Sequence, residues 1–495
     1  MNAGDIAGII KAARTAQEIW SQIPYRERAR RLKKGGRRLS LHLDEIIETI
    51  HRENGKLRMD ALAAELLPAV LALDYYTRIG RKMLAPRNIR GGSLLMFNKR
   101  SRLVRKPWGV AGIISPWNYP FAIPFSEVVM ALLAGNAVLL KAASLTPGAG
   151  RAIASIFEAA DLPSGLFTHV EIPGAEAGPA FISGGVDKLF FTGSTAVGKQ
   201  LMALAAPRLL PLVLELGGAD AAIIRADADL DRAALGILWS GFSNAGQSCG
   251  GAQRILVHRD VYDSFLEKLC ALVRGLRGGD GEDSDFGPMA AVKQKKSAEK
   301  DIAACVAMGA KIAAQSSVPD DERFMPAVVL TGLTPDMPVM TGEIFGPVVG
   351  VYSVRDDAEA LRVANASSYG LTASVWSRNR RDARALAAGI NAGAVMINDH
   401  LMSHGLAETP WGGFGDSGLG RTHGEAGFSE MLKTTVVVDD VLPGVRRNLF
   451  WHPYSEKVYR GFRAITVFAG FSPFFEKLRQ LPAIVKLFFR YWSSK

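Results

Sequence analysis

Apolar residues recur every three or four positions through the first 85 residues of the chain, which is the repeat of a helix with one buried face. This pattern predicts helices over residues 3–85. The basic run RERARRLKKGGRR (26–38) lies in this region, and we interpret it as a solvated helix face. Residues 91–109 then alternate strand-like segments with a turn and end at Pro107 and Gly109.

The pattern changes after residue 109, where short apolar runs end in Gly, Pro, Ser or Asn and helical segments lie between them. The first series contains VAGIISPWN, NAVLLKAAS, GLFTHVEIPG and KLFFTGS. A second series follows residue 220 and contains AAIIRADAD, RILVHRD, GAKIAAQ, AVVLTGL, VVGVYSV, TASVWS and AVMIND. Strands that alternate with helices predict βαβ units and parallel sheets. We therefore expect an α/β protein with two such domains in series.

Composition bounds the size and the partners of the protein. A chain of 495 residues, 48% hydrophobic and 22% charged, is long enough for two or three domains with sizeable cores. The formal net charge is +11, but residues 444–495 hold ten Lys and Arg against Glu456 and Glu476, an excess of eight. A basic tail on a nearly neutral body is a local feature and predicts no nucleic-acid partner.

The cysteine content predicts the redox environment. Three cysteines, an odd number, exclude a disulfide framework, and the sequence has neither a CxxC motif nor a Cys/His cluster, so we expect no metal. The N-terminus has no basic segment followed by an apolar core and cleavage site, and we therefore expect a cytoplasmic protein. Cys270 and Cys305 stand at helix-like apolar spacing and are expected to be buried.

Cys249, in contrast, lies in NAGQSCGGAQR (244–254) among small residues. One interpretation is a turn that contains a cysteine by chance. The other is a nucleophile with room for a substrate carbon to reach its sulfur. The segment alone does not decide between them.

One interpretation of KLFFTGSTAVGKQLMALAA (188–206) is a helix whose N-terminus binds phosphate. There an apolar strand runs into Gly193 and Ser194, and Gly198 falls in the first turn of the next helix. The spacing is G-x4-G rather than the dinucleotide fingerprint G-x-G-x-x-G. An ordinary strand–turn–helix therefore explains this segment as well.

Two polar residues in apolar segments are further candidates. Asn118 in GIISPWNYPF is either a structural turn residue or a side-chain donor to an oxyanion. Glu215 in LVLELGGAD is either structurally paired or a general base whose pKa is raised by burial. In TGEIFGPVV (341–349), Glu343 precedes an apolar turn that contains Phe345.

Taken together, PWN, the strand-ending Lys141, FTGS with G-x4-G, LELGG, GQxC and E-x-FGP resemble the aldehyde dehydrogenase superfamily in order and spacing, from about residue 5 to residue 440. The resemblance implies an α/β fold with two Rossmann-type parallel-sheet domains, a β-hairpin oligomerisation element and a homodimer or homotetramer. The expected parts are a dinucleotide-binding domain (1–88 and 108–217), a catalytic domain (218–420), the oligomerisation element (89–107 and 430–440) and a C-terminal amphipathic extension (441–495).

The resemblance also implies a reaction, in which an aldehyde is oxidised to a carboxylic acid with NAD or NADP. Cys249 would be the nucleophile, Asn118 and the backbone N–H of Cys249 would hold the oxyanion, and Glu215 would activate water. No metal is implied. The expected cofactor contacts are Ser115, Trp117, Lys141, Ser144, Gly193, Ser194, Gly198, Leu216, Glu343 and Phe345.

One departure from the family pattern bears on the cofactor. Many NAD-preferring members carry an acidic residue at the position of Ser144, where it would repel a 2′-phosphate. Ser144 is uncharged, can donate to a phosphate, and follows Lys141 by three residues. We therefore expect NADP to be accepted, with the preference between NADP and NAD left open.

The segment INDHLMSHGLAETPWGGFGDSGLGRTHGEAGFSEM (397–431) resembles the branch that acts on apolar or carotenoid-derived aldehydes, which implies a medium- or long-chain or other apolar substrate. His400 and His404 either line the substrate tunnel or lie on a surface loop. The alternative function is a catalytically silent scaffold at a membrane surface. It would have no reason to retain the whole set Cys249, Glu215, Asn118, Lys141 and Glu343.

The C-terminal tail combines aromatic and basic residues. Its longest uncharged run, Ala464 to Phe475, has 12 residues, and a spanning helix needs about 20. Aromatic residues beside basic ones suit an interfacial helix on anionic lipid. We therefore expect peripheral contact of 445–495 with the cytoplasmic face of a membrane, and the alternative is that the tail packs on protein.

Overall fold

The computed structural model describes residues 2–93, 96–442 and 444–491. The chain divides into two compact units, one formed by Met1–Ala85 with Arg105–Lys433 and the other by Pro86–Val104 with Thr434–Lys495. Among the described residues, no helix is both long enough and apolar enough to cross a lipid bilayer.

The first sheet of the larger unit has the strand order β17-β7-β6-β3-β4-β5. All neighbours are parallel except β17, which is antiparallel to β7. Its central apolar runs are buried along their whole length, as expected for strands covered on both faces. The strands are β3 (Val110–Ile114), β4 (Ala137–Lys141), β5 (Phe167–His169), β6 (Lys188–Thr192), β7 (Leu212–Glu215) and β17 (Gly418–Leu419).

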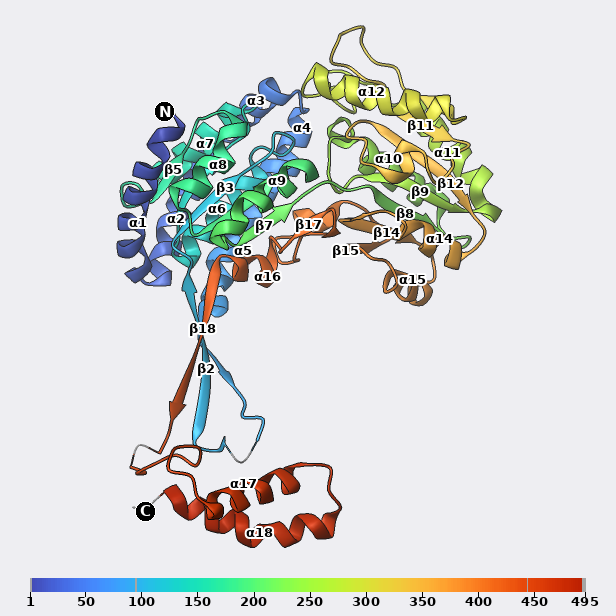
Figure 1. Ribbon diagram of the computed structural model, residues 1–495. Helices are drawn as coiled ribbons and strands as arrows, with labels where there is room; N and C mark the ends of the chain where they lie inside the picture. The colour runs from blue at the N-terminus through green and yellow to red at the C-terminus, as the bar shows by residue number, and fades with distance from the viewer. Residues whose placement is uncertain (1, 94–95, 443, 492–495) are drawn as a thin grey trace. The chain divides into compact units, whose positions relative to one another are not determined.

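Helices surround this sheet, and α1, α6 and α8 contact β3 directly (Figure 1). The predicted helical character of residues 3–85 is confirmed. The helices are α1 (Ile6–Gln22), α2 (Tyr25–Leu41), α3 (Leu43–Asn54), α4 (Arg58–Ala61), α5 (Leu67–Leu84), α6 (Ala122–Ala134), α7 (Pro147–Glu158), α8 (Gly174–Gly184) and α9 (Thr195–Ala205), with a π-helical turn at Leu62–Leu66.

The basic run 26–38 forms most of α2, and the expectation of a solvated face is confirmed for its cations with one exception. Arg28 is buried, and a Cβ atom at Gly135 would collide with its guanidinium group. Burial lowers the pKa of Arg28 to about 10. One cation of this run therefore belongs to the interior.

The second sheet has the strand order β10-β11-β12-β9-β8-β14-β15, and only the edge strand β10 is antiparallel to its neighbour. Every apolar run of the second predicted series lies in one of these strands. They are β8 (Asp220–Ile224), β9 (Ala252–His258), β10 (Lys311–Gln315), β11 (Val328–Thr331), β12 (Val348–Val354), β14 (Thr372–Trp376) and β15 (Ala394–Ile397). The accompanying helices are α10 (Leu230–Phe242), α11 (Tyr262–Gly275), α12 (Val292–Ala307), α13 (Pro338–Thr341), α14 (Asp357–Ala364) and α15 (Arg380–Ala387).

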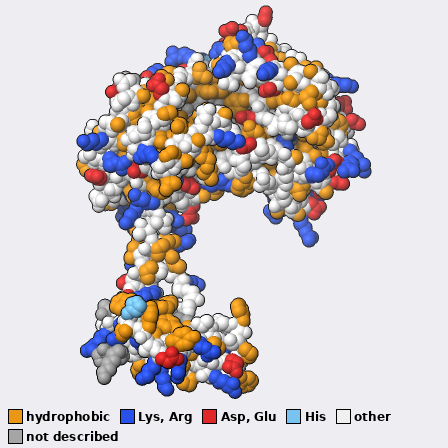
Figure 2. Space-filling view, in the orientation of Figure 1, with side chains coloured by type: hydrophobic (Ala, Val, Ile, Leu, Met, Phe, Trp, Pro, Cys, Tyr) orange, Lys and Arg blue, Asp and Glu red, His pale blue; other side chains and the backbone are white. Residues whose placement is uncertain are grey.

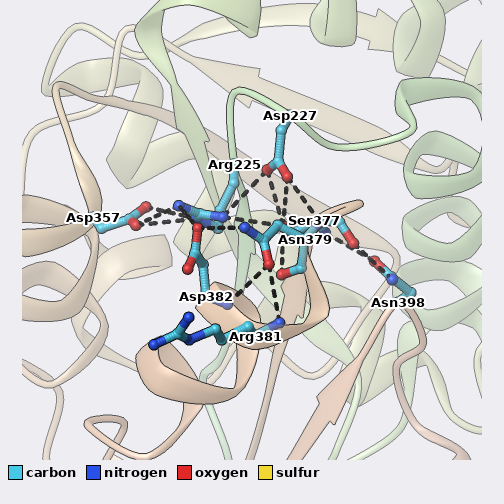
Figure 3. Close-up of polar contacts among 8 residues, drawn as sticks. All are labelled: Arg225, Asp227, Asp357, Ser377, Asn379, Arg381, Asp382 and Asn398. Atoms are coloured by element: carbon cyan, nitrogen blue, oxygen red, sulfur yellow. Dashed lines mark hydrogen bonds and ion pairs between the residues drawn. The ribbon is translucent and has the colours of Figure 1, made fainter.

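A polar network at the carboxyl end of β8 holds α14 and α15 in place (Figure 3). Arg225 donates from Nε to both carboxylate oxygens of Asp357 at 3.0 Å. Asp227 accepts from the Ser377 hydroxyl at 2.8 Å and from the Asn379 backbone N–H at 2.9 Å. Because Asn379 also caps α15, the network fixes the start of that helix.

The two sheets have separate hydrophobic cores, but residues that follow the second sheet in sequence return to the first sheet. Ala407 and Phe428 belong to the core of the first sheet, and β17 pairs with β7 of that sheet. Residues after the second sheet therefore complete the first one. The short strand β16 (Phe414–Gly415) and the helix α16 (Gly424–Glu430) lie in this part of the chain, and β16 pairs with β13 (Tyr369–Gly370), which precedes β14. The domain boundaries given above remain predictions.

The smaller unit contains most of a three-stranded sheet of order β1-β2-β18, formed by β1 (Arg87–Ile89), β2 (Lys99–Pro107) and β18 (Leu432–Asp440). Asp440 accepts hydrogen bonds from Lys99, from the backbone N–H of Leu442, and from Asn98 and Asn448, and these donors lower its pKa to about 2. The C-terminal segment forms two helices, α17 (Glu456–Ala469) and α18 (Phe474–Phe488), which pack together.

Candidate active site

The candidate site lies where neighbouring parallel strands of the first sheet end. The pairing sets Ile114 beside Lys141 and beside Phe191, and it sets Thr192 beside Glu215. Since these strands run in the same direction, their carboxyl ends meet at one edge of the sheet. The residues that follow them are therefore brought together from four separate parts of the sequence.

Asn118 lies in the turn between β3 and α6 and is buried. Its side-chain Nδ2 donates to the carbonyl of Gln247 at 3.1 Å. Its own backbone carbonyl accepts from Lys56 Nζ at 2.8 Å and from Asn244 Nδ2 at 3.2 Å. The carboxamide is thus held against the segment that carries Cys249.

Lys56 and Glu65 support this turn, and sequence reasoning did not identify them. They form an ion pair of 2.6 Å with both side chains fully buried. The second oxygen of Glu65 accepts from the backbone N–H groups of Phe121 and Ala122 at 3.0 and 2.8 Å. In the sequence these two residues resemble surface charges of the helical region, and no local pattern distinguishes them.

The loop before Cys249 has an unusual backbone. Asn244, Ala245 and Gly246 have φ angles of 52°, 54° and 67°, a left-handed conformation that is costly for residues with a side chain. A Cβ atom at Gly246 would also collide with the backbone carbonyl of Gly346. Gln247 fixes the loop, because its side chain donates to the Asn244 carbonyl at 3.0 Å and accepts from the Ala290 N–H at 2.9 Å.

Acidic neighbours and burial control the protonation of the thiol. Burial, followed by the charges of Glu343, Asp220 and Glu215, raises the pKa of Cys249. The pKa of Glu215 is also raised well above its ordinary value, first by burial and then by the nearby charge of Glu127. Among the described residues, neither carboxylate oxygen of Glu215 has a hydrogen-bond partner. Glu215 therefore keeps both oxygens free to accept a proton.

Aromatic and acidic residues line the other side of the site. The rings of Trp117 and Phe345 meet edge to face with their centroids 5.5 Å apart. Glu343 accepts from the backbone N–H of Gly218 at 3.0 Å, and burial raises its pKa to about 7. Gly198 allows α9 to pack closely, since a Cβ atom there would lie 2.6 Å from a methyl group of Leu216.

A cavity of about 210 Å³ joins these groups. It is lined by Pro116, Trp117, Asn118, Thr192, Gly193, Ser194, Glu215, Leu216, Gly217, Cys249, Gln294, Glu343 and Phe345. Three predicted catalytic residues and six predicted cofactor contacts therefore share one cavity. Gln294, from α12, was not predicted, and its helix shows no motif that would have singled it out.

Four predicted residues do not line this cavity, namely Ser115, Lys141, Ser144 and Gly198. Lys141 Nζ lies 3.1 Å from Ser144 Oγ, and burial lowers the pKa of this lysine. The backbone N–H of Ser115 donates to the carbonyl of Lys141 at 3.1 Å. These three residues thus form a neighbouring cluster at the ends of β3 and β4.

The structure also places the other two cysteines and two of the histidines. Cys270 and Cys305 are buried, as predicted. His400 is fully buried, so a surface position is wrong for this residue, and its ring bonds to Ser374 Oγ at 2.8 Å. His404 packs edge to face against Trp411, with ring centroids 4.8 Å apart. Within the described part of the chain, no group of three or more His, Cys, Asp or Glu residues is placed to hold a metal ion.

Comparisons with known proteins point to one family. The aldehyde dehydrogenase family pattern matches residues 1–437. A 4,4'-diapolycopene aldehyde oxidase of Methylomonas sp is 35% identical over 458 residues, which cover 92% of this chain and 85% of the relative. A putative succinate-semialdehyde dehydrogenase (NADP(+)) of Mycolicibacterium smegmatis is 37% identical over 440 residues, 88% of this chain and 84% of the relative.

Solved structures give the same result. An NADP-dependent enzyme of E. coli has a TM-score of 0.85 and 31% identity, and the match covers 89% of this chain and 91% of the other. An NAD-dependent aldehyde dehydrogenase from Sinorhizobium meliloti has a TM-score of 0.85 and 32% identity over 91% of this chain and 89% of the other. The chain belongs to the aldehyde dehydrogenase family, and it is an oxidoreductase that oxidises an aldehyde with NAD or NADP.

Proposed function

We propose that Cys249 attacks the aldehyde carbon and that Asn118 and Glu215 serve the same reaction. The supporting observation is the single cavity that contains all three side chains. Cys249 attacks as the thiolate, after its proton has left to water. The sulfur bonds to the carbonyl carbon, the carbon–oxygen π bond breaks, and the resulting oxyanion accepts from the Asn118 amide and the Cys249 backbone N–H. The loop bonds of Asn118 to Gln247 and Asn244 hold the donor in position before substrate arrives.

Glu215 acts in the second half of the reaction. A nicotinamide held by Glu343 and Phe345 would supply the hydride acceptor for this oxidation, and Cys249 would then carry the acyl group as a thioester. One unpartnered oxygen of Glu215 takes a proton from water, the water oxygen bonds to the acyl carbon, and the carbon–sulfur bond breaks. The products are a carboxylic acid and the free thiol. Burial, followed by the charge of Glu127, raises the pKa of Glu215, which makes it a stronger base toward water than an ordinary carboxylate.

Two variants test these roles. We expect Cys249→Ala to abolish both cofactor reduction and acid formation. We expect Glu215→Gln to allow one burst of cofactor reduction and then to slow acid release at least a hundredfold, because the thioester forms but water is not activated. Burst kinetics with product analysis checks both. Full turnover of Cys249→Ala with any aldehyde would overturn the proposal.

The residues present fit a dinucleotide cofactor. Ser115 Oγ and Thr192 Oγ1, at the ends of two strands, are buried without a hydrogen-bond partner among the described residues. Ser194 stands at the N-terminus of α9 and makes no side-chain cap, so the first N–H groups of the helix can receive a pyrophosphate. Lys141 and Ser144 would hold the adenosine ribose, and Glu343 and Phe345 the nicotinamide end.

We propose a preference for NADP, supported by the uncharged Ser144 beside Lys141. Comparing kcat/KM for the two cofactors tests it. Replacing Ser144 with Glu should shift the ratio toward NAD by tenfold or more, because a carboxylate repels a 2′-phosphate. A hundredfold NAD preference of the unmodified enzyme would contradict this part.

For the substrate we propose a medium- or long-chain or other apolar aldehyde, supported by the similarity to the diapolycopene aldehyde oxidase. A series of aldehydes of increasing chain length tests it, with succinate semialdehyde as the charged comparison. We expect kcat/KM to rise with chain length. A higher value for succinate semialdehyde would favour the activity named for the mycobacterial relative.

We further propose that the chain forms a homodimer or homotetramer through β18. Val436, Val437 and Val438 are 53%, 48% and 58% exposed on an edge strand, where backbone N–H and C=O groups remain open for pairing. Replacing Val437 with Lys should lower the molecular mass measured by light scattering. Contact of residues 445–495 with a membrane surface is the last part of the proposal, supported by their basic and aromatic composition.

A further inference from the structure

α18 carries an exposed apolar stripe along its whole length. Its members follow one another at spacings of four, three, four and four residues, so they share one side of the helix. They are Phe474 (69% exposed), Leu478 (42%), Leu481 (39%), Val485 (55%) and Phe489 (67%), the last of which directly follows α18. At about 1.5 Å per residue the stripe is roughly 22 Å long.

The stripe is not the side on which the hairpin folds. Ile484 and Leu487 lie on another side of α18 and are buried. A Cβ atom at Gly461 of α17 would lie 2.8 Å from Leu487, so the two helices pack closely there. The hairpin therefore has its own small core and leaves the stripe uncovered within its unit.

The turn between the helices extends the apolar surface. Phe471 is fully exposed, and Phe475 is 75% exposed beside the first residue of the stripe. Large aromatic side chains exposed together mark a contact site more often than an ordinary protein surface. The end of the hairpin thus presents a cluster of three phenylalanines.

Basic residues flank the stripe. Lys477 and Lys486 precede and follow stripe residues, which puts one lysine on each side of it. Neither has an ion-pair partner in the described ranges, whereas Arg460 and Arg479 pair with Glu456 and Glu476 at 2.9 Å. Figure 2 shows Lys and Arg side chains beside hydrophobic ones on this unit. The surface is therefore apolar with a positive border.

We propose that the α17–α18 hairpin lies on an anionic lipid surface, with the stripe, Phe471 and Phe475 at the boundary of headgroups and acyl chains and the lysines among the phosphates. This inference rests on the membrane contact proposed above, and it names the surface that makes that contact. A second copy of the chain would bring like charges together across the same face, whereas anionic headgroups neutralise them. Apolar aldehydes dissolved in the bilayer then lie in the same phase as the docking surface.

Co-sedimentation of the full chain with vesicles tests the proposal. The wild type should bind phosphatidylcholine vesicles that contain phosphatidylglycerol and should bind pure phosphatidylcholine much more weakly. Val485→Glu should reduce binding about tenfold, because it places a charge in the stripe. Lys477→Ala and Lys486→Ala should each weaken binding about fivefold and reduce its salt dependence. Leu235→Glu is the matched control, since Leu235 is also 55% exposed but lies on α10 of the other unit.

The outcomes separate this inference from the proposed chemistry. Sedimentation needs no turnover, and all four variants should oxidise a water-soluble aldehyde as the wild type does. Equal binding of Val485→Glu and wild type, or no binding to anionic vesicles, would overturn the lipid surface. Loss of a dimer in Val485→Glu, without any vesicle binding by the wild type, would assign the stripe to self-association and would also overturn it.

Discussion

Cys249 is surrounded by groups that oppose its ionisation. Burial and the three carboxylates Glu343, Asp220 and Glu215 raise the pKa of the thiol, so the free protein holds it protonated near neutral pH. We predict that alkylation of Cys249 by iodoacetamide, measured without cofactor, still accelerates with pH above pH 8, because only the thiolate reacts. Peptide mass spectrometry isolates this site from Cys270 and Cys305. A rate plateau below neutral pH would contradict the prediction.

Glu127 is a buried carboxyl group in α6 whose pKa is raised by burial from 4.5 to about 8. The folded chain thus binds this proton more tightly than the unfolded chain. Stability is then lost as the pH rises from about 4.5 to about 8 and is constant above that window. We predict that Glu127→Gln is more stable than the wild type at pH 8.5 by up to about 5 kcal/mol, with no difference at pH 4. Urea unfolding at both pH values measures it, and a gain that is equal at both would refute it.

At the scale of elements, the turn with Asn118 depends on a charge pair far from it in sequence. Removing one partner of a buried pair leaves an unpaired charge and costs about 3–5 kcal/mol. We predict that Glu65→Gln lowers the free energy of unfolding by this amount and also lowers kcat, because Lys56 no longer fixes the backbone of Asn118. Glu48→Gln is the control, since Glu48 pairs with Arg58 at 2.8 Å on the surface. A Glu65 variant as stable and active as this control would contradict the prediction.

The sequence pattern predicted the strands better than it predicted how the edge of the first sheet is completed. Short apolar runs beside turn residues are local signals, and they suffice for β3–β12, β14 and β15. The pairing of β17 with β7 is carried by two residues and could not be seen in a pattern. The sequence pattern also missed Lys56 and Glu65, because they contact segments more than 50 residues away in the sequence. It missed Gln294 because only a single side chain of its helix lines the cavity. The residues of the short motifs, in contrast, could be predicted because the motifs occur together in the order and spacing of one family.

At the scale of the whole molecule, the two units differ greatly in the size of their cores. The buried core of the α17–α18 hairpin consists of Leu449, Val458, Leu487 and Tyr491 with a few half-buried neighbours, whereas each sheet of the larger unit has an extensive core. A small core gives little stability of its own. The hairpin should therefore open at lower free energy than the sheets.

This difference in core size predicts which segments exchange their amide hydrogens faster after a core substitution. Leu487→Ala removes a buried side chain at the closest approach of α17 and α18, and such a change costs about 2–5 kcal/mol. We expect amide hydrogen exchange to accelerate across residues 456–488 while β3, β6 and β7 keep their protection and the aldehyde turnover of the enzyme is unchanged. Ile484→Val, a smaller deletion at another buried position of α18, should give a smaller acceleration in the same segment. Loss of protection in the sheets would show instead that the two units unfold together, because the free energy of the hairpin would then be part of one cooperative transition.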